Sequence, residues 1–497
     1  MGGTEKVERQ RSRGKLNVRQ RFERFLDPGS LFELGSIAGV AGHDAQGRLE
    51  RFCPANLIFG RGRVAGAPLV VSGDDFTVRG GAADASIWAK QVMAEQMAHE
   101  LRLPIVRFID GTGGGGSVKM LDTPGARTYI PEVPGWSWVV QNLSAVPVVA
   151  LALGPVAGLG AARLVSSHYS LMVKGLSQVF VAGPPVVAHT GEQVDKEALG
   201  GSHIHARNGV VDDEVQSEEQ AFDRARRFLS YLPPSVHALP PRGPREDPVD
   251  RRDEALIGLV PRSSRRVYKM RPLIERQVDR DSFFEMGRLW GRSAITGLAR
   301  LDGWPVAVIA NDPYHYGGGW TADAAHKLVR FLDLAETFQL PVVHLVDNPG
   351  FVIGTAAEQA GTIRHGARAL AAVYQASVPI CAILVRKCFG VAGAAHMNQS
   401  RLRMRYAWPS ADWGSLPVEG GIEAAYRAEL EASEDPDALL AEIRTRLDSV
   451  RSPLRSAEAF LAEEIIDPRD TRPLLCEFAN LAAPLRSIGP AAVPYRP

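Results

Sequence analysis

The chain has 497 residues, of which 45% are hydrophobic and 23% are charged, and its formal net charge at pH 7 is +1. This length predicts at least two domains, and the hydrophobic fraction is sufficient to give each domain a core. Because the charge is balanced, no strong field would attract nucleic acid or an acidic membrane surface, and neither is an expected partner.

The cysteines and the N-terminal segment indicate the compartment. Cys53, Cys381, Cys388 and Cys476 form no Cys-x-x-Cys pair, so the sequence shows neither a zinc ribbon nor a redox motif. The N-terminus is charged and lacks the apolar core of a signal peptide, and the longest apolar run (146–162) is interrupted by glycine and proline. We therefore expect a soluble, cytoplasmic protein without a bound metal.

Short apolar runs alternate with longer helical patterns along the whole chain. The sequence predicts the following elements in chain order: strand 69–72, helix 82–101, strands 105–109 and 148–153, helix 216–229, strand 306–310, helix 321–338, strand 342–346, helix 360–376, strand 380–385 and helix 435–448. The strands show no period-two alternation, which is typical of sheets buried on both faces by helices. The predicted fold class is therefore α/β.

The two halves of the chain resemble each other in sequence. The stretch LPIVRFID from Leu103 returns as LPVVHLVD from Leu340, at an offset of 237, and Gly158 corresponds to Gly390 at an offset of 232. Such a period is far longer than the roughly 20–50 residues of a solenoid repeat, so it indicates a duplicated domain. A proline-rich segment (233–271) is predicted to be an extended linker between the copies. We predict domains at 1–250 and 251–497, with two similar sites.

Glycine-rich turns follow several of the predicted strands, at 111–116, 154–160 and 386–395. A strand that ends in glycine and opens a helix presents free backbone amides and the positive end of the helix dipole. Such amides can stabilise a carbonyl oxygen that becomes an oxyanion. The alternative is that the glycines only allow a helix to pack closely on a strand. The sequence contains neither a phosphate-binding P-loop nor a Gly-x-Ser-x-Gly nucleophile elbow.

Two side-chain arrangements offer weaker alternatives. His203 and His205 could form a metal-binding pair, but no third ligand has suitable spacing, so structural histidines are the preferred interpretation. Glu358 and His365 could share one helix face as an acid/base pair, although exposed helix polarity is the more ordinary meaning. The sequence therefore points to chemistry carried by backbone amides.

Several motifs, taken in order, carry a resemblance to a known family. They are DFTVRGG (75–81), GPVAG (154–158), GPPVV (183–187), DNPGF (347–351), RKCFG (386–390) and AWP (407–409). With them the chain resembles the carboxyltransferase (β) subunits of biotin-dependent acyl-CoA carboxylases, of the propionyl-CoA and methylcrotonyl-CoA carboxylase type. The resemblance extends from about Lys15 to Phe460.

The resemblance implies a fold, an activity and partners. The fold would be two tandem crotonase-like (ClpP/crotonase) domains, and the activity a transferase or ligase reaction that moves CO2 from carboxybiotin to the α-carbon of an acyl-CoA. Residues 1–250 would hold the acyl-CoA and residues 251–497 would meet biotin, with the site between two different subunits, usually within a hexamer. The partners would be a biotin carboxylase and a biotin carboxyl carrier subunit.

The resemblance also assigns residues. The two oxyanion holes fall at Gly158, Leu159 and Gly160, and at Gly390, Val391 and Ala392. The expected substrate-binding residues are Phe76, Thr77, Gly80, Gly81, Gly113, Gly114 and Ala394, and the expected biotin-facing residues are Gly350, Phe351 and Gly393.

Some positions depart from the family pattern. The family often has Gly-Gly where this chain has Gly158-Leu159 and Gly390-Val391, and an acidic residue of many relatives is replaced by Ala394. Two alternatives therefore stay open: a decarboxylase or transcarboxylase that uses the same half-reaction, and an inactive subunit that only scaffolds an active one. The sequence leaves the acyl group open as well.

Overall fold

The computed structural model describes residues 1–82, 87–111, 127–128, 130–263, 265–417, 421–422, 425–448 and 450–497. It divides into unit 1 (Met1–Leu239 with Ile488–Pro497) and unit 2 (Pro240–Ser487). The division thus lies before the predicted boundary at 250/251, and the C-terminal segment belongs to unit 1 rather than to the second half. Tyr495 accounts for this return, because it is buried, its ring lies 4.5 Å from that of His168, and its hydroxyl donates to the carbonyl of Ser167.

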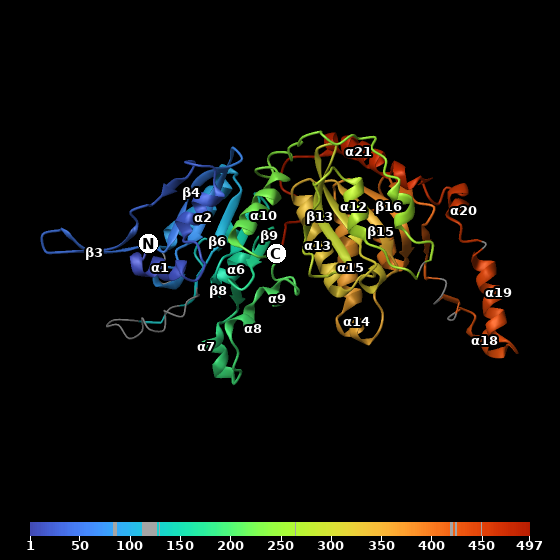
Figure 1. Cartoon of the computed structure of the whole chain (residues 1–497), viewed down its shortest axis with the longest axis horizontal. Helices are drawn as coiled ribbons and strands as arrows, with labels where there is room; N and C mark the ends of the chain where they lie inside the picture. The colour runs from blue at the N-terminus through green and yellow to red at the C-terminus, as the bar shows by residue number, and fades with distance from the viewer. Residues whose placement is uncertain are drawn as a thin grey trace. The chain divides into compact units, whose positions relative to one another are not determined.

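Unit 1 is built on a seven-stranded sheet (Figure 1). Its strands, in spatial order, are β1 (Phe32–Leu34), β4 (Leu57–Val64), β5 (Ala67–Asp74), β6 (Ile105–Ile109), β7 (Val148–Ala152), β9 (Tyr169–Val173) and β11 (Asp213–Val215). The first three strands are antiparallel and the rest are parallel. Two small sheets accompany it: β2 (Gly39–His43) with β3 (Leu49–Pro54), and β8 (Pro155–Ala157) with β10 (Gln178–Phe180).

Helices cover both faces of this sheet. The helices of unit 1 are α1 (Thr4–Arg11), α2 (Val18–Phe25), η1 (Arg79–Gly81), α3 (Trp88–Leu101), α5 (Trp136–Asn142), α6 (Leu159–Val165), α7 (Pro184–Val187), η3 (Ala188–Thr190), α8 (Lys196–Gly200), α9 (Ser202–His205) and α10 (Glu218–Ser230). In β6, Phe108 packs against Phe22 of α2 and Phe222 of α10, while Arg107 binds Glu95 of α3. Because successive strand residues point to opposite faces, α2 and α10 cover one face and α3 covers the other.

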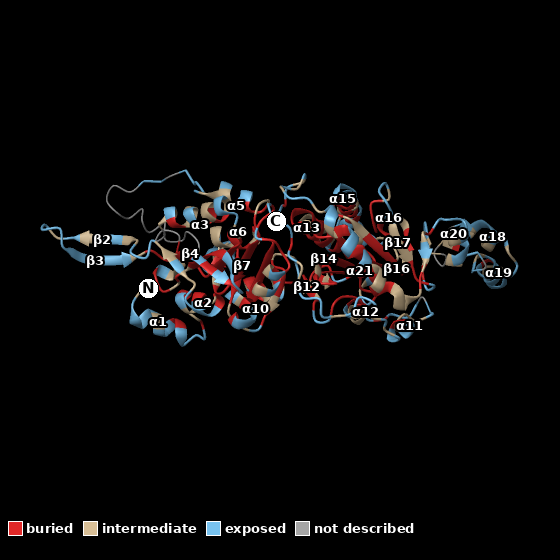
Figure 2. Ribbon diagram, turned by 90° about the horizontal axis from the view of Figure 1, so that it is seen from above, coloured by how far each residue is buried: buried red, intermediate tan, exposed pale blue. Residues whose placement is uncertain are grey.

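Unit 2 repeats the same strand order. Its sheet runs β12 (Phe284–Met286), β13 (Ala294–Leu301), β14 (Trp304–Asn311), β15 (Val342–Asn348), β16 (Ile380–Phe389), β17 (Met404–Ala407) and β19 (Glu464–Ile465), and β18 (Asp412–Gly414) pairs with the end of β16. Most strands of both sheets are buried along most of their length (Figure 2), whereas of β1, β17, β18 and β19 only Ala407 is buried. This burial explains why their sequences lack a period-two pattern.

The helices of unit 2 are α11 (Ala255–Leu259), α12 (Met270–Gln277), η4 (Tyr316–Gly318), α13 (Ala322–Thr337), α14 (Thr355–Gln359), α15 (Thr362–Gln375), α16 (Gly390–Ala394), α18 (Arg427–Ala432), α19 (Pro436–Asp448), α20 (Pro453–Glu458), η5 (Pro468–Asp470), α21 (Thr471–Ala482) and η6 (Ala483–Leu485). Leu273 and Ile274 of α12 and Phe478 of α21 share one core cluster with Val343 and Ile383 of the sheet. Within the ranges given above, no helix is long and apolar enough to cross a membrane.

Backbone geometry shows the duplication more sharply than the sequence does. Non-glycine residues with positive φ recur in pairs that are separated by the offset of the sequence repeat, namely Ala65 and Asp302, Arg79 and Tyr316, and Arg102 and Gln339. Such a conformation costs about 1–2 kcal/mol for each of these residues, so its repetition indicates a common constraint. A buried lysine also returns: Lys90 donates to the carbonyl of Gly35 and Lys327 to that of Gly287.

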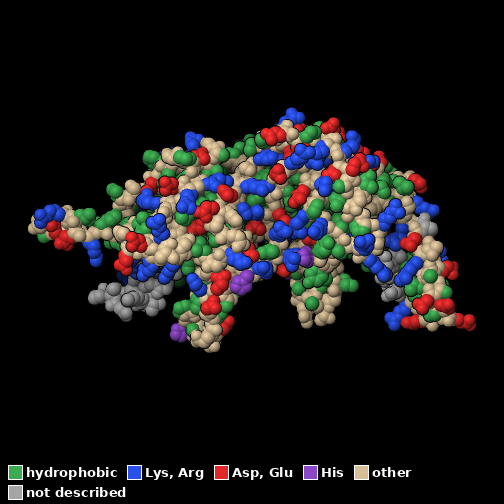
Figure 3. Space-filling model, in the orientation of Figure 1, with side chains coloured by type: hydrophobic (Ala, Val, Ile, Leu, Met, Phe, Trp, Pro, Cys, Tyr) green, Lys and Arg blue, Asp and Glu red, His purple; other side chains and the backbone are tan. Residues whose placement is uncertain are grey.

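The proline-rich segment 233–271 is not an extended linker throughout, and this part of the prediction was wrong. It contains α11 and the first residues of α12, because Leu256 and Met270 are buried in the core of unit 2. Arg271, which closes the basic run of this segment, forms ion pairs with Glu285 and Asp312, both at 2.6 Å. Elsewhere, basic and acidic side chains are mixed over the face seen in Figure 3, in keeping with the balanced net charge.

Candidate active site

The first predicted amide turn, which we call the unit 1 amide turn (158–160), lies between β8 and α6. Gly158 adopts φ 58° and ψ −120°, a conformation that glycine tolerates, and its carbonyl accepts the first bond of α6 from Ala162. Its own N–H donates to the carbonyl of Phe180 at 3.3 Å, because β8 pairs with β10. Gly158 therefore shapes the turn, whereas the N–H groups of Leu159 and Gly160 lie in the first helical turn and have no intrahelical acceptor.

Other predicted glycines of the first half lie beside this turn. An added Cβ at Gly81 would lie 2.6 Å from the carbonyl oxygen of Asp110, and one at Gly160 would lie 3.6 Å from that of Gly111. Gly80 and Gly81 have φ values of 63° and 66° and need glycine for that reason also. The structure thus brings Gly81, Gly111 and Gly160 together. Gly113 and Gly114 lie outside the described residues.

Phe76 and Thr77 lie in the loop after β5. Thr77 is buried, its hydroxyl donates to Asp75 Oδ1 at 2.5 Å, and it accepts the N–H of Gly2. The half-buried ring of Phe76 carries Lys15 Nζ 4.3 Å from its centre. The Thr77 side chain therefore holds the loop, and the Phe76 ring contacts a buried cation.

A buried charge network supports the ends of β6 and β7. Asp110 accepts from Lys15 at 2.7 Å and from Arg21 at 2.8 Å, and Arg21 also binds Glu218 at 2.6 Å and the carbonyl of Leu153 at 2.9 Å. Burial lowers the pKa of Lys15, and the nearby carboxylate of Asp110 opposes this effect without cancelling it.

Our sequence reasoning missed this network, although a signal was present. Arg21 falls in the apolar stripe of α2, between Val18, Phe22 and Phe25, where a charge is costly unless it is paired. An arginine in such a stripe indicates a buried partner.

The second predicted turn, the unit 2 amide turn (390–392), follows β16. Gly390 has φ 60° and opens α16, so the N–H groups of Gly390, Val391 and Ala392 lie in its first turn and have no intrahelical acceptor. Val391 is 51% exposed, which places its amide close to the surface of unit 2. Both turns thus place a glycine of positive φ at the start of a short helix, but Gly158 precedes α6 and its N–H is bonded to Phe180, whereas Gly390 is the first residue of α16.

The predicted biotin-facing residues divide into two kinds. An added Cβ at Gly350 would lie 3.7 Å from the carbonyl oxygen of Phe389, so Gly350 borders the turn. Gly393 is buried, and a Cβ there would meet the carbonyl carbon of Cys388 at 2.8 Å, so close packing requires this glycine. The ring of Phe351 packs against Trp320 and Gly366. Ala394 is exposed beside the turn.

A buried ion pair lies just before the unit 2 amide turn, at the repeat position of the unit 1 network. Asp347, the counterpart of Asp110, is fully buried and accepts from Arg386 at 3.0 Å and from the N–H of Lys387 at 3.0 Å. Arg386 also donates to the carbonyl of Arg266 and lies over the ring of Tyr268. Both units therefore neutralise an aspartate at the end of the fourth strand of the sheet order, β6 in unit 1 and β15 in unit 2, but with different partners.

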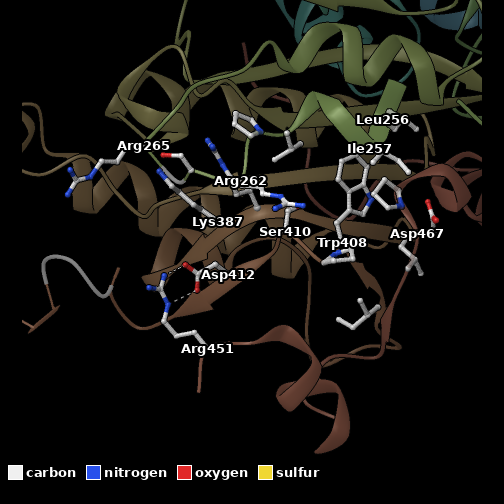
Figure 4. A pocket seen from close by; sticks show the side chains of 18 of the residues that line it. Leu256, Ile257, Arg262, Arg265, Lys387, Trp408, Ser410, Asp412, Arg451 and Asp467 are labelled. Atoms are coloured by element: carbon white, nitrogen blue, oxygen red, sulfur yellow. Dashed lines mark hydrogen bonds and ion pairs between the residues drawn. The ribbon is translucent and has the colours of Figure 1, made fainter. Parts of the chain in front are cut away.

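Unit 2 also contains a cavity of about 1050 Å³, whose lining includes Asp412 of β18. At one end Arg262, Lys387 and Ser410 lie close together, and at the other Trp408 and Ile257 give an apolar wall (Figure 4). Within it, Arg451 forms ion pairs with Asp412 and Asp448. Its lining shares Arg386 and Lys387 with the strand that leads to the unit 2 amide turn, but it includes none of the predicted biotin-facing residues.

The side-chain alternatives are not supported by the geometry. Glu358 and His365 do not share a helix, because Gly361 at φ 66° separates α14 from α15. His205 Nε2 contacts the carbonyl of Val179 at 2.8 Å, while His203 lies near Glu197. Among the residues that the structure describes, no cluster of three or more His, Cys, Asp and Glu could hold a metal ion.

Comparison with known proteins agrees with the geometry. The model of the carboxyl transferase domain family matches residues 9–487. The chain is 32% identical to a propionyl-CoA carboxylase carboxyltransferase subunit of Haloferax mediterranei, over 95% of this chain and 91% of that one. It is 29% identical to the methylmalonyl-CoA decarboxylase subunit alpha of Veillonella parvula, over 98% of this chain and 93% of that one.

The fold is similar to that of a solved structure as well. The crystal structure of transcarboxylase 12S, a hexamer with hydrolysed methylmalonyl-coenzyme A bound, matches with a TM-score of 0.86 and 29% identity over 99% of this chain and 94% of that one. The prediction of an α/β protein with two crotonase-like domains is thereby confirmed.

Proposed function

The chain belongs to the carboxyl transferase domain family, and from this premise we propose that it is the carboxyltransferase subunit of a biotin-dependent acyl-CoA carboxylase. In this proposal the chain transfers CO2 to the α-carbon of an acyl-CoA thioester, and the α-proton that the CO2 replaces would be taken up by biotin. Unit 1 takes the acyl-CoA and unit 2 takes biotin, which a separate carrier subunit holds and which would supply the CO2.

The observation that carries the proposal is the pair of amide turns at matching places in two repeated units. In unit 1, the N–H groups of Leu159 and Gly160 would hold the thioester oxygen as it becomes an enolate oxygen. In unit 2, the N–H groups of Gly390, Val391 and Ala392 would hold the ureido oxygen of biotin as negative charge grows there. Chemistry of this kind needs amides that bind the transition state more tightly than the ground state.

The residues of unit 2 fit a biotin ring in two respects. The unit 2 amide turn lies beside the half-exposed Val391, so an oxygen that arrives from outside the unit can reach its N–H groups. Gly350 borders the turn without a side chain that would block it. In unit 1, Gly81 and Gly111 likewise place no side chain of their own beside the unit 1 amide turn, and Val156 and Ile109 are its apolar neighbours at Gly160.

A second candidate is the same half-reaction in the opposite direction, as in a CoA-ester decarboxylase or a transcarboxylase. The similarity to the methylmalonyl-CoA decarboxylase subunit and to transcarboxylase 12S favours it. Both activities would use the same two amide turns. We further propose that copies of the chain assemble as a cytoplasmic hexamer, as reported for transcarboxylase 12S, and that a biotin carboxylase completes the enzyme.

The half-reaction itself tests the proposal. Purified chain, a carboxylated CoA ester such as methylmalonyl-CoA, and free biotin are incubated together, and loss of the carboxyl group from the ester is followed by mass spectrometry. Loss that depends on biotin supports carboxyl transfer. Loss at the same rate without biotin, or no loss with any carboxylated ester, would contradict it.

Capture of the tagged chain from its own host provides the complementary measurement. Labelled streptavidin should detect a biotinylated subunit in stoichiometric amount. An accompanying biotin carboxylase subunit would favour the carboxylase direction, whereas its absence with the carrier present would favour the second candidate.

A further inference from the structure

In both units, a side chain from the fourth strand of the sheet order, β6 or β15, donates to a backbone carbonyl at or just beyond the C-terminal end of the helix that follows the amide turn. In unit 1, Arg107 of β6 donates from Nη1 to the carbonyls of Arg163 at 2.9 Å and Ser166 at 2.6 Å, at the end of α6. In unit 2, His344 of β15 donates from Nδ1 to the carbonyl of His396 at 3.0 Å. Arg107 and His344 are separated by the offset of the sequence repeat and therefore occupy the same position in it.

In unit 2 a second bond continues this connection into α16. His396 lies two residues after the end of the helix, and its Nδ1 contacts the carbonyl oxygen of Gly393 at 2.7 Å. His344 thus holds the backbone of His396, and the His396 side chain holds the last turn of α16. The sulfur of Cys388, at the end of β16, lies 3.5 Å from the same Gly393 oxygen.

The two units compensate the buried charge in different ways. In unit 1, Glu95 of α3 binds Arg107 through two hydrogen bonds of 2.8 Å. The repeat places Leu332 of α13 at the position of Glu95, and Leu332 is buried. The charged Arg107 of unit 1 is thus paired with the carboxylate of Glu95, whereas His344 of unit 2 has the apolar Leu332 at the matching position. Each unit therefore avoids an unpaired buried charge.

The two histidines are neutral in the folded chain. Burial lowers the pKa of His344 to about 3 and that of His396 to about 4. Each neutral imidazole carries one N–H. It lies on Nδ1, because Nδ1 of His344 and of His396 faces a carbonyl oxygen, which can only accept. Among the described residues, Nε2 of both rings is buried without a hydrogen-bond partner, which accords with an unprotonated nitrogen.

Direct contact with a substrate does not explain these side chains. Arg107 is 0% exposed and His344 is 3% exposed, so neither reaches a bound molecule. Simple filling of the core would favour an apolar residue, because a buried polar group is costly unless it is hydrogen-bonded. The shared property of arginine and histidine at this position is the bond to the end of the helix.

We propose that Arg107 and His344 are equivalent positioning residues, each of which fixes the helix of one amide turn against the fourth strand of its sheet, β6 in unit 1 and β15 in unit 2. The inference rests on the proposed function of the two turns. The helices α6 and α16 are short, each at most two turns, and would not hold their orientation alone. Oxyanion donors act at about 2.7–3.1 Å, and a displacement of about 1 Å can slow a reaction about 100-fold.

The test compares His344→Leu, which removes the donor, with His344→Asn, whose amide nitrogen can replace Nδ1. Hydrogen exchange of the backbone amides in residues 389–397 is measured in the full chain by mass spectrometry. We expect exchange to rise about tenfold in the leucine variant, as for one lost hydrogen bond, and to stay near the native rate in the asparagine variant. His205→Leu, which removes a histidine–carbonyl contact in unit 1, is the control and should leave residues 389–397 unchanged.

Kinetics provide the second readout. With free biotin and methylmalonyl-CoA, His344→Leu should lower kcat about 10- to 100-fold while KM for the CoA ester changes less than about twofold, and His344→Asn should restore most of kcat. Unchanged exchange in residues 389–397 of the leucine variant would overturn the inference, as would equal behaviour of the two variants. If the native chain shows no turnover, the proposed function fails, and the exchange data still decide whether His344 holds α16.

Discussion

Removal of a single N–H from the unit 2 amide turn is the most direct test of its role. Val391→Pro achieves this, because proline lacks the N–H and its ring restricts φ to the range of an α-helix. Val391 lies in the first turn of α16, where proline is well tolerated and the N–H has no intrahelical acceptor. The substitution should therefore leave the hydrogen bonds within α16 intact.

The expected effect follows from the chemistry of such donors. Loss of one oxyanion donor raises the barrier by about 3–4 kcal/mol, which corresponds to a roughly 10²- to 10³-fold lower kcat. The side chain itself should matter little, because it is 51% exposed. Val391→Ala, which keeps the N–H and shortens the side chain, is therefore the matched control and should retain kcat within about threefold.

The assay is biotin-dependent loss of the carboxyl group from a carboxylated CoA ester, followed at saturating ester, with the midpoint of urea unfolding measured for each variant. A proline variant as active as the alanine variant would refute the role of this N–H. If both variants were equally slow, the side chain rather than the amide would be responsible. A large fall in the unfolding midpoint of the proline variant alone would show that α16 does not accept proline, which contradicts the geometry of the turn given above.

Three further predictions concern stability. His344 and His396 have a pKa near 6.5 in the unfolded chain but only about 3 and about 4 in the folded chain. Their contribution to the free energy of unfolding is therefore complete above about pH 6.5 and is lost as the pH falls, by about 2 kcal/mol each at pH 5. Urea unfolding at pH 7 and pH 5 measures this loss, and His344→Asn should remove about half of the difference. Arg21→Met should destabilise unit 1 by about 3–5 kcal/mol, because it leaves the buried carboxylates of Asp110 and Glu218 without the arginine that they share. The control Arg19→Ala removes an exposed arginine and should cost less than about 1 kcal/mol. Equal effects of the two substitutions would argue against a buried network. Gly318 has φ 91°, and an added Cβ would lie 2.3 Å from a backbone oxygen, so Gly318→Ala should lower the free energy of unfolding by about 3 kcal/mol or more. Gly47 has φ 77° with open space around it, so Gly47→Ala should lower it by about 1 kcal/mol. Similar urea-unfolding midpoints of the two variants would contradict the close packing around Gly318.

Local sequence was sufficient for the architecture. The strand 105–109 was predicted with the bounds that β6 has, and the helix 435–448 differs from α19 by a single residue at its start. Apolar runs between glycines and prolines indicate burial, and each predicted strand overlaps one observed strand, although the predicted strand 148–153 ends one residue beyond β7 (Val148–Ala152). The internal repeat predicted a duplicated domain, and the two units share one strand order because residues that satisfy the same backbone constraints recur in the same order.

The boundary and the linker were harder to predict, because they depend on contacts between distant segments. Tyr495 belongs to unit 1 through its contacts with Ser167 and His168, which lie in the first half of the sequence, and no local pattern encodes that choice. Part of the proline-rich segment likewise forms a helix, because the side chain of Leu256 is buried in the core of unit 2.

By itself the sequence determined where the glycine turns occur and that they occur twice, since the positive φ values of Gly158 and Gly390 are a local requirement that glycine meets. Tertiary structure decided which amides are free and what holds them. The N–H of Gly158 donates to the carbonyl of Phe180 because two short strands pair, and Arg107 and His344 reach from a strand to carbonyls near the ends of their helices. Hydrogen bonds are directional and short-ranged, so their partners are defined only when the folded chain has brought distant residues within about 3 Å of each other.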